Sequence, residues 1–280
     1  MTRPSPPASG PPAFAGFSDV DGTGAPREYA ALLDAIRAQP AVQDWKARTF
    51  AALEPVPGAV LLDVGCGTGE DVRALARRVA PGGRAIGVDS SAGLVAEARV
   101  RSAAEVAGTV EFIRADAHAL PLASGAVGGA RVERVLQHLA DPGRAVAEMA
   151  RVVRPGGRVV AAEPDWGTFV IDSDDPWVAG RVAAAAARRL RSPAVGRTLR
   201  RLFVEARIED VEVTTRSLVV TDGQAAATVF DVRGAAWKAV EDGDLAADRA
   251  AAWLDGVARA STEGRGLASL TAFLAVGRAP

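Results

Sequence analysis

The residues best suited to chemistry lie in and around a glycine-rich turn at 65–69. The sequence reads VLLDV at 60–64, then GCGTG, and continues with a helical pattern from Glu70. Glycines allow the backbone to approach a ligand closely and to adopt positive φ. The N-terminus of the following helix presents free N–H groups and a partial positive charge to an anionic group. The segment therefore predicts a strand, a ligand-binding loop and a helix in succession.

Acidic residues occur at the ends of three further apolar runs. Asp89 follows the run at 85–88, about twenty residues beyond the turn, where an acid can accept hydrogen bonds from both hydroxyls of a ribose. Asp116 follows the run at 110–113, and Glu133 follows the run at 127–132. Because ligands of open parallel sheets bind outside the carboxyl ends of the strands, we expect these carboxylates to face one site.

The elements that must position these residues alternate between strands and helices. We expect strands at 60–64, 85–88, 110–113, 127–132 and 158–162, and helices near 70–80, 91–106 and 143–153. This alternation predicts a parallel sheet covered by helices on both faces. Elsewhere the patterns predict two helices within each of 27–53, 176–207 and 224–263, and strands at 211–220 and 267–277.

These motifs together are similar to those of a known family. In chain order they are VLLDVGCGTGED at 60–71, GVD at 87–89, VEFIRAD at 110–116, VERVLQHL at 132–139 and RPGGRV at 154–159. The set resembles the class I S-adenosylmethionine-dependent methyltransferases, in particular the small-molecule branch that includes the ubiquinone and menaquinone methyltransferases, and it covers about residues 58–163. The resemblance implies an α/β, Rossmann-like fold. Its seven-stranded sheet would be mostly parallel, with helices on both faces and the last strand antiparallel.

The resemblance also implies S-adenosyl-L-methionine as the cofactor. The residues that would bind it are Asp63, Gly65, Cys66, Gly67, Gly69, Asp89, Ser90, Asp116, Ala117, Glu133 and Arg48. Within this set Asp63 would order the glycine loop from beneath, Asp89 would bind the ribose, and Asp116 would bind the adenine amino group. Arg48, in the helix before the first strand, is the candidate cation for the cofactor carboxylate. Cys66 stands between two glycines, so we expect a small space-filling residue there and not a nucleophile.

Candidates for the acceptor side follow the fourth and fifth strands. His138 is a possible general base, because an imidazole titrates near neutral pH, but a structural or cofactor-side role fits its leucine neighbours better. Asp165 is the second catalytic candidate, at the end of the fifth strand; the alternative is a rigid turn with Trp166 packed in the core. We expect Trp45, Trp166 and Trp237 in the acceptor pocket.

The chain is expected to form one domain at 14–280 after a disordered tail at 1–13 that is rich in Pro, Gly and Ser. Its parts would be N-terminal helices at 14–56, a cofactor-binding core at 57–163, helical lid segments at 164–208 and 224–263, and final strands at 209–223 and 264–280. We expect the segments outside the sheet to form a helical lid over its carboxyl edge and to enclose the acceptor with apolar walls.

The composition excludes several other classes. The net charge is −1, from 33 basic and 34 acidic residues, so the chain has no global basic field for nucleic acid. A single cysteine and two histidines make a disulfide framework or a metal cluster improbable. No apolar stretch is long enough to span a membrane, and the first residues lack a signal core. We therefore expect a cytoplasmic monomer or homodimer with a small-molecule acceptor, no metal and no membrane insertion.

Two competing functions remain open beside small-molecule methyl transfer. A nicotinamide-dependent oxidoreductase would carry G-x-G-x-x-G and a Tyr-x-x-x-Lys pair or a histidine proton donor; here the loop is G-x-G-x-G, and the single tyrosine is Tyr29. A cofactor-binding protein of the same fold without transferase activity would carry the same donor motifs. The identity of the acceptor and the atom that is methylated, oxygen, nitrogen or carbon, are left open by the sequence.

Overall fold

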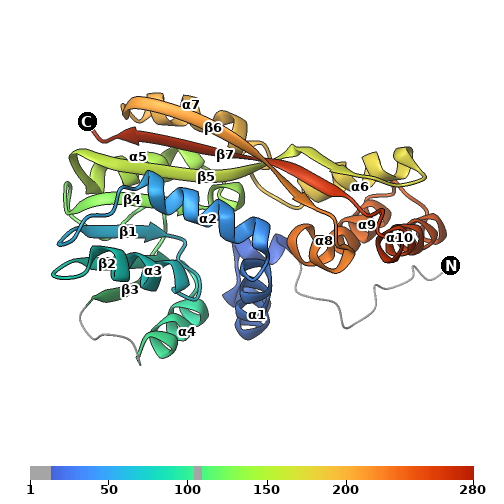
Figure 1. The fold of residues 1–280 in the computed structure, drawn as a ribbon, viewed down its shortest axis with the longest axis horizontal. Helices are drawn as coiled ribbons and strands as arrows, with labels where there is room; N and C mark the ends of the chain where they lie inside the picture. Colours follow the sequence, from blue (N-terminus) through green and yellow to red (C-terminus); the bar gives the residue numbers. More distant parts are fainter. Residues whose placement is uncertain (1–13, 104–108) are drawn as a thin grey trace.

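A computed structural model describes residues 14–103 and 109–280 of the chain (Figure 1). The tail expected at 1–13 lies outside the described residues. So does the end of the helix expected at 91–106, whose described part is α4 (Ala92–Ser102). The molecule is elongated, with the parallel strands in one half and most of the C-terminal helices in the other.

The centre of the fold is a seven-stranded sheet in the order β3-β2-β1-β4-β5-β7-β6. The strands β1 to β5 pair in parallel, whereas β7 runs antiparallel between β5 and β6. The predicted α/β sheet with an antiparallel last strand is therefore confirmed. The strand bounds are β1 Val60–Val64, β2 Arg84–Asp89, β3 Val110–Arg114, β4 Val127–Glu133, β5 Val153–Ile171, β6 Glu209–Val220 and β7 Ala268–Arg278.

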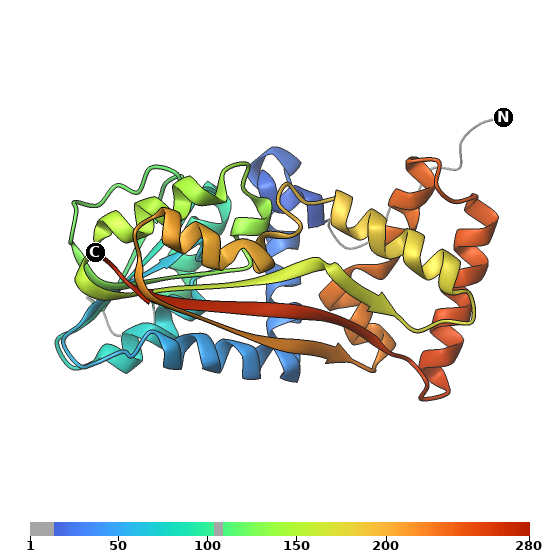
Figure 2. The same cartoon turned by 90° about the horizontal axis from the view of Figure 1, so that it is seen from above.

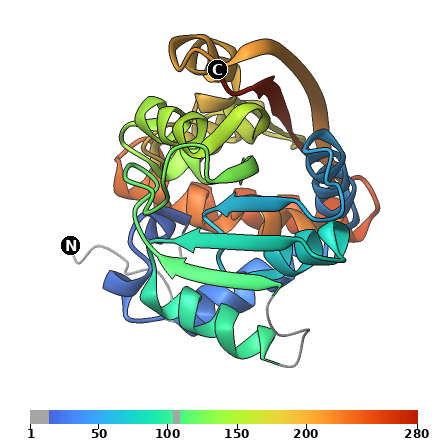
Figure 3. The ribbon, with the colours of Figure 1, turned by 90° about the vertical axis from the view of Figure 1, so that its left-hand side faces the viewer.

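Helices cover both faces of the sheet, so successive residues of the central strands are buried (Figure 3). Leu61 packs in a cluster with α2 (Pro40–Ala52), α3 (Glu70–Val79) and α4, whereas Leu62 packs in a cluster with α5 (Pro142–Val152) and α7 (Val195–Glu205). Successive strand residues point to opposite faces, and both faces are buried here, so β1 is apolar without alternation. The sheet thereby holds its carboxyl edge rigidly.

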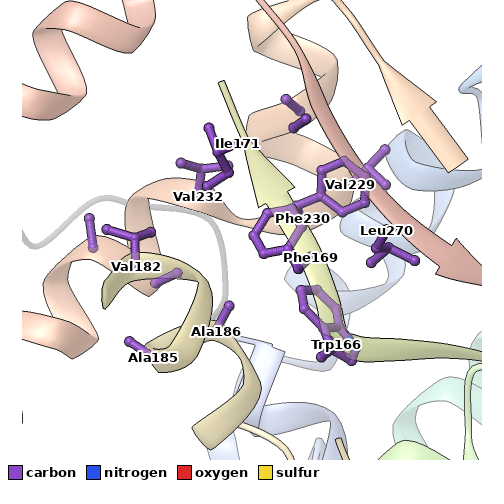
Figure 4. Close-up of a cluster of buried hydrophobic side chains, with 14 of the residues drawn as sticks. Trp166, Phe169, Ile171, Val182, Ala185, Ala186, Val229, Phe230, Val232 and Leu270 are labelled. Atoms are coloured by element: carbon purple, nitrogen blue, oxygen red, sulfur yellow. The ribbon is translucent and has the colours of Figure 1, made fainter. Parts of the chain in front are cut away.

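The second half of the molecule is organised around the ends of β5, β6 and β7 that extend beyond the parallel part of the sheet. β5 runs for 19 residues, well beyond the strand expected at 158–162, because its end pairs with the start of β7. The helices α6 (Pro176–Arg188), α8 (Gly223–Phe230), α9 (Val232–Glu241) and α10 (Ala247–Thr262) gather around this extension (Figure 2). Their core contains Trp166, Phe169 and Phe230, which pack edge-on or tilted (Figure 4).

Two expectations for the C-terminal helices were wrong. The segment 224–263 forms three helices and not two, because Asp231 adopts φ 49° between α8 and α9 and caps α9 through the Gly234 nitrogen. A buried ion pair with Arg189 keeps Asp231 inside an otherwise apolar region. In the predicted lid segment 164–208, α7 does not lie over the carboxyl edge: it packs on the sheet face beside α5, burying Leu199 and Phe203.

The N-terminal helices complete the wall beside the carboxyl edge. η1 (Phe14–Ser18), η2 (Asp21–Thr23) and α1 (Pro26–Arg37) precede α2. Both α1 and α2 begin with proline, which is pre-organised for the first helical position. Among the described ranges, no helix has the length and apolar composition needed to cross a bilayer.

Candidate active site

A cavity of about 340 Å³ lies at the carboxyl ends of β1, β2, β3 and β4. On one side it is lined by the loops that follow these strands, and on the other by η1, α1 and α2. It continues along β5, β7 and α8 in the helical half of the molecule. A concave site of this size at the carboxyl edge is typical of small-molecule binding in open α/β folds.

The glycine loop lies against this cavity in a conformation that excludes larger residues. Gly65 has φ 71°, and a Cβ atom there would lie 2.2 Å from a methyl group of Val135. Gly67 has φ 51° and lines the cavity together with Cys66. Gly69 was expected to line the cavity as well, but it lies outside the lining and against Phe112, so its lack of a side chain serves packing between the loop and β3.

Asp89, at the end of β2, is held by two backbone nitrogens. Its oxygens accept from Gly67 N at 2.8 Å and Ser91 N at 2.9 Å, and the side chain lines the cavity beside Ser90. Burial raises the pKa of Asp89, although the backbone donors oppose this shift. A carboxylate has about four acceptor positions, so Asp89 can accept a further hydrogen bond from a ligand.

Asp116 and Ala117 line the cavity after β3, together with His118. Asp116 is exposed, and its carboxylate accepts from the His118 backbone nitrogen at 2.9 Å and lies 2.7 Å from His118 Nδ1. The backbone hydrogen bond from His118 lowers the pKa of Asp116. The Nε2 atom of His118 is buried without a hydrogen-bond partner among the described residues. Sequence reasoning missed His118 as a residue of the cavity lining, although its place two positions after Asp116 was a signal.

Arg131 is the centre of a buried charge cluster beneath the glycine loop. Its guanidinium donates to Asp63 at 2.6 Å, lies 3.1 Å from Asp71 and also pairs with Glu133. Lys46 from α2 pairs with Asp71 and lies 3.3 Å from Glu133. The cluster connects α2, β1, β4 and the start of α3. Sequence reasoning missed the two cations, although an arginine inside the apolar run at 127–132 was a signal of a buried ion pair.

The charges in this cluster compensate one another. Burial raises the pKa of Asp63 to about 6, against the lowering effect of Arg131. Burial would also raise the pKa of Asp71, but the charges of Lys46 and Arg131 lower it overall. Removal of one partner would leave an uncompensated buried charge, so we expect each member to matter for folding.

Arg48 does not reach the cavity. Its side chain is exposed and pairs with Asp44 one helical turn earlier. Arg134 lines the cavity instead, after β4, with a backbone φ of 55°. Its Nε atom forms an ion pair with Glu133 Oε1 at 3.3 Å, outside hydrogen-bond geometry, so both buried atoms lack a hydrogen-bond partner among the described residues. Arg134 is thus a cation that lines the cavity, whereas Arg48 is not.

Two acids within β5, Glu163 and Asp165, hold the structure around the cavity and do not line it. Asp165 is fully buried, pairs with Arg197 of α7 and accepts from Gly167 N at 2.9 Å. Its carboxylate is thus engaged away from the cavity, contrary to the expected catalytic role. Glu163 accepts from the backbone nitrogens of Val135 and Leu136, both at 2.8 Å, and burial raises its pKa to about 8.

His138 lines the cavity in the short helix η3 (Leu136–His138). Its ring lies 5.5 Å from that of Phe17, between centroids, and its Nε2 atom lies 3.3 Å from the Gln137 amide nitrogen. Burial, assisted by the charge of Arg134, lowers the pKa of His138 to about 3. A neutral imidazole with so low a pKa is a weak base, so these surroundings favour a structural role.

Two of the three tryptophans expected in the pocket lie there. Trp45 and Trp166 are buried and line the cavity, whereas Trp237 of α9 does not line it. The cavity wall in the helical half is formed by β5, β6, β7 and α8. The helix α9 contacts α8 but contributes no residue to the lining. The apolar lining of this half is Phe14, Phe17, Val42, Trp166, Leu218, Val229, Phe230 and Leu270.

Comparisons with known proteins agree with this geometry. A family described as a methyltransferase domain matches residues 62–161. A Streptomyces fradiae protein, the uncharacterized 37.1 kDa protein in transposon TN4556, is 39% identical over 248 residues, 88% of this chain and 70% of that protein. The 2-phytyl-1,4-naphtoquinone methyltransferase of Thermosynechococcus vestitus is 40% identical over 114 residues, 41% of this chain and 50% of that enzyme.

This chain belongs to the class I S-adenosylmethionine-dependent methyltransferases. The matched part spans only half the length of the naphtoquinone methyltransferase. Among solved structures, the [4+2]-cyclase SpnF aligns with a TM-score of 0.55 and 22% identity, covering 96% of this chain and 99% of that one. At this identity the likeness shows the fold alone.

The residues of this methyltransferase fit S-adenosylmethionine at the cavity. Buried polar atoms normally have hydrogen-bond partners. One atom in each of His118, Glu133 and Arg134 has none among the described residues, and these three side chains line the cavity. The remaining acceptor capacity of Asp89 suits a ribose hydroxyl. The backbone of Gly65 and Gly67 leaves room for close approach of a ligand. In the described part of the chain, no group of His, Cys, Asp and Glu is arranged to hold a metal ion.

Proposed function

We propose that this methyltransferase transfers the methyl group of S-adenosylmethionine to a small, largely apolar acceptor. The observation that carries the proposal is the continuity of the cavity. Charged and hydrogen-bonding groups line it at the carboxyl edge of the sheet, and aromatic and aliphatic groups line it in the helical half. A polar cofactor and an apolar acceptor would therefore meet inside one cavity.

On the cofactor side, each polar residue would bind a different part of S-adenosylmethionine. Asp89 would accept hydrogen bonds from the ribose hydroxyls, and Asp116 with Ala117 would contact the adenine. Arg134 would bind the carboxylate, and Glu133 Oε1 would accept from the amino group. Arg134 Nε and Glu133 Oε1 form an ion pair, and neither has a hydrogen-bond partner among the described residues. They would offer a donor and an acceptor side by side to a ligand with adjacent carboxylate and amino groups.

S-adenosylmethionine supplies an electrophilic methyl group on a sulfonium centre when it is bound. The chain would contribute chiefly by position and by exclusion of water. Phe17, Trp166 and Phe230 would hold the acceptor atom in line with the carbon–sulfur bond that breaks as the new bond to the methyl carbon forms. His138 stays neutral over the physiological range and would shape the wall between the two halves of the cavity.

Binding of S-adenosylhomocysteine and NADH, measured by calorimetric titration, tests the donor assignment. We expect S-adenosylhomocysteine to bind and Asp89→Ala to weaken it tenfold or more, because two charge-assisted hydrogen bonds contribute about 1.5–3 kcal/mol each. Asp141→Ala is the matched control: it removes an aspartate that accepts from the Arg144 nitrogen at the start of α5, outside the cavity. Binding of NADH without S-adenosylhomocysteine would overturn the donor assignment.

A second measurement separates methyl transfer from mere cofactor binding. The protein with S-adenosylmethionine would be offered a panel of apolar phenols, hydroquinones and amines, and S-adenosylhomocysteine release would be followed. Turnover on any member supports transfer. Binding of S-adenosylhomocysteine without turnover across the panel favours a protein that keeps this fold for other chemistry, as the name of the structurally similar [4+2]-cyclase illustrates.

A further inference from the structure

The part of the cavity contributed by the second half of the chain contains a single charged residue. Among the described residues that line the cavity, those after position 163 are Pro164, Trp166, Arg191, Leu218, Val229, Phe230, Leu270 and Ala272. All of these except Arg191 are apolar or aromatic. A lone guanidinium at the edge of an apolar wall offers a directional contact to an anionic group and little to a neutral hydrocarbon.

Arg191 also differs from the arginines beside it in sequence. Arg188 pairs with Asp242 and Asp244, Arg189 pairs with Asp231, and Arg197 pairs with Asp165. Arg191 has no hydrogen bond or ion pair with any residue in the described ranges, and it is the one of these arginines that lines the cavity. Its donors are therefore available to a ligand.

The backbone that bears Arg191 is fixed against the cavity wall. The next residue, Ser192, donates from its backbone nitrogen to Gln137 O and from its hydroxyl to Leu139 O, both at 2.9 Å. The carbonyl of Pro193 accepts from Trp166 N, also at 2.9 Å. These bonds attach the segment between α6 and α7 to η3 and β5. They therefore fix the position of the Arg191 backbone near Trp166.

We infer that the acceptor carries an anionic group, a carboxylate or a phosphate, that Arg191 binds while an apolar body fills the helical half of the cavity. This inference rests on the proposed function, because it assumes that the acceptor occupies this half. Arg191 is then a specificity-determining residue: it fixes which end of an amphiphilic acceptor faces the cavity entrance. The opposite end of the acceptor would face the glycine loop.

Binding of three probes with the same chain length tests this inference. Decanoate, decyl phosphate and decanol would be titrated calorimetrically into the full-length protein, below their aggregation concentrations, with and without S-adenosylhomocysteine. We expect both anions, or one of them, to bind about tenfold more tightly than decanol, because a charged hydrogen bond is about twice as strong as a neutral one. A preference between the two anions identifies the group as carboxylate or phosphate.

Three variants locate the contact. Arg191→Gln should remove the preference for the anions and leave the decanol affinity unchanged. Arg201→Gln is the matched control, because Arg201 is an exposed arginine of α7 outside the cavity lining, and we expect it to change nothing. Leu218→Trp, on the edge strand β6, should weaken all three probes by filling the apolar wall.

Equal binding of decanol and the anions to the wild type would overturn the inference, as would an anion preference that survives Arg191→Gln. Unchanged probe binding in Leu218→Trp would also overturn it, since the chain would then lie elsewhere. The titration of S-adenosylhomocysteine alone reports on the proposed function separately. If that ligand fails to bind while the anion preference follows Arg191, the donor assignment is wrong and the anion site stands.

Discussion

The indole nitrogen of Trp166 donates a hydrogen bond of 2.7 Å to the side-chain oxygen of Gln137, and both side chains are buried. The bond connects β5 to η3 at the junction between the two halves of the cavity. Gln137 Nε2 in turn donates to the carbonyl of Arg134 at 3.2 Å. The Gln137 side chain thus connects Trp166, in the wall of the proposed acceptor site, to the backbone of Arg134, the residue proposed to bind the cofactor carboxylate.

Trp166→Phe should therefore affect both stability and acceptor binding. The substitution leaves the Gln137 oxygen buried without a donor, which costs about 1–3 kcal/mol of unfolding free energy. We expect a weaker acceptor interaction and little change in S-adenosylhomocysteine affinity, measured by urea unfolding and calorimetry. Trp253→Phe is the control, because Trp253 also loses an indole hydrogen bond, to Ser173, but lies outside the cavity. Equal functional loss in both variants would contradict a specific role for Trp166.

Arg134→Gln should weaken binding of ligands that carry the cofactor's amino-acid part. We expect S-adenosylhomocysteine to lose about tenfold in affinity, as for a charged hydrogen bond to a carboxylate. The affinity for 5′-methylthioadenosine, which lacks the carboxylate, should stay unchanged. Arg48→Gln serves as the control, since Arg48 is exposed and paired with Asp44. A loss of affinity for both ligands in Arg134→Gln would point to a general disturbance of the loop after β4.

Glu163 should make the unfolding free energy depend on pH between about 4.5 and 8. Burial raises its folded pKa to about 8 from an ordinary value of 4.5, so folding favours the protonated form. This contribution is fully present below about pH 4.5 and is lost as pH rises towards 8. Glu163→Gln resembles the protonated carboxyl and removes the dependence.

The measurement is urea unfolding of the wild type and Glu163→Gln at several pH values. Between pH 6 and pH 8, we expect the wild type to lose about 2 kcal/mol of unfolding free energy relative to the variant. Other titrating groups affect both proteins alike, so the difference isolates Glu163. Parallel stability curves would show that Glu163 is ionised in the folded protein throughout this range.

His138→Gln should reduce turnover less than tenfold once an acceptor is known. The pKa of His138 is lowered to about 3, so the ring is neutral from pH 5 upwards and its protonation cannot shape a pH–rate profile near neutrality. Glutamine keeps a hydrogen-bonding group at this wall. A general base contributes typically about 10²–10⁴-fold, so a hundredfold loss with intact cofactor affinity, and loss of the acidic limb, would identify His138 as the base.

Local sequence determined the cofactor-side strand ends and the turn between β1 and α3. The positions of β1 to β4 followed from short apolar runs, and Asp89 and Asp116 followed from their place at the strand ends. These features depend on neighbouring residues: a positive φ at Gly65 and the start of a helix at Glu70 are decided within a few positions. A prediction from the sequence alone therefore succeeds here.

Only the tertiary structure decided which charged and aromatic residues reach the cavity. Lys46 and Arg48 lie two positions apart in α2, and a helix turns about 100° per residue, so the two side chains point in nearly opposite directions. Lys46 faces Glu133, a residue 87 positions away, whereas Arg48 faces solvent. The length of β5 was likewise decided by its pairing with β7, a strand about a hundred residues later in the chain. The direction of a side chain in α2 and the length of β5 depend on contacts between distant segments. The residue pattern of one segment alone does not reveal these contacts.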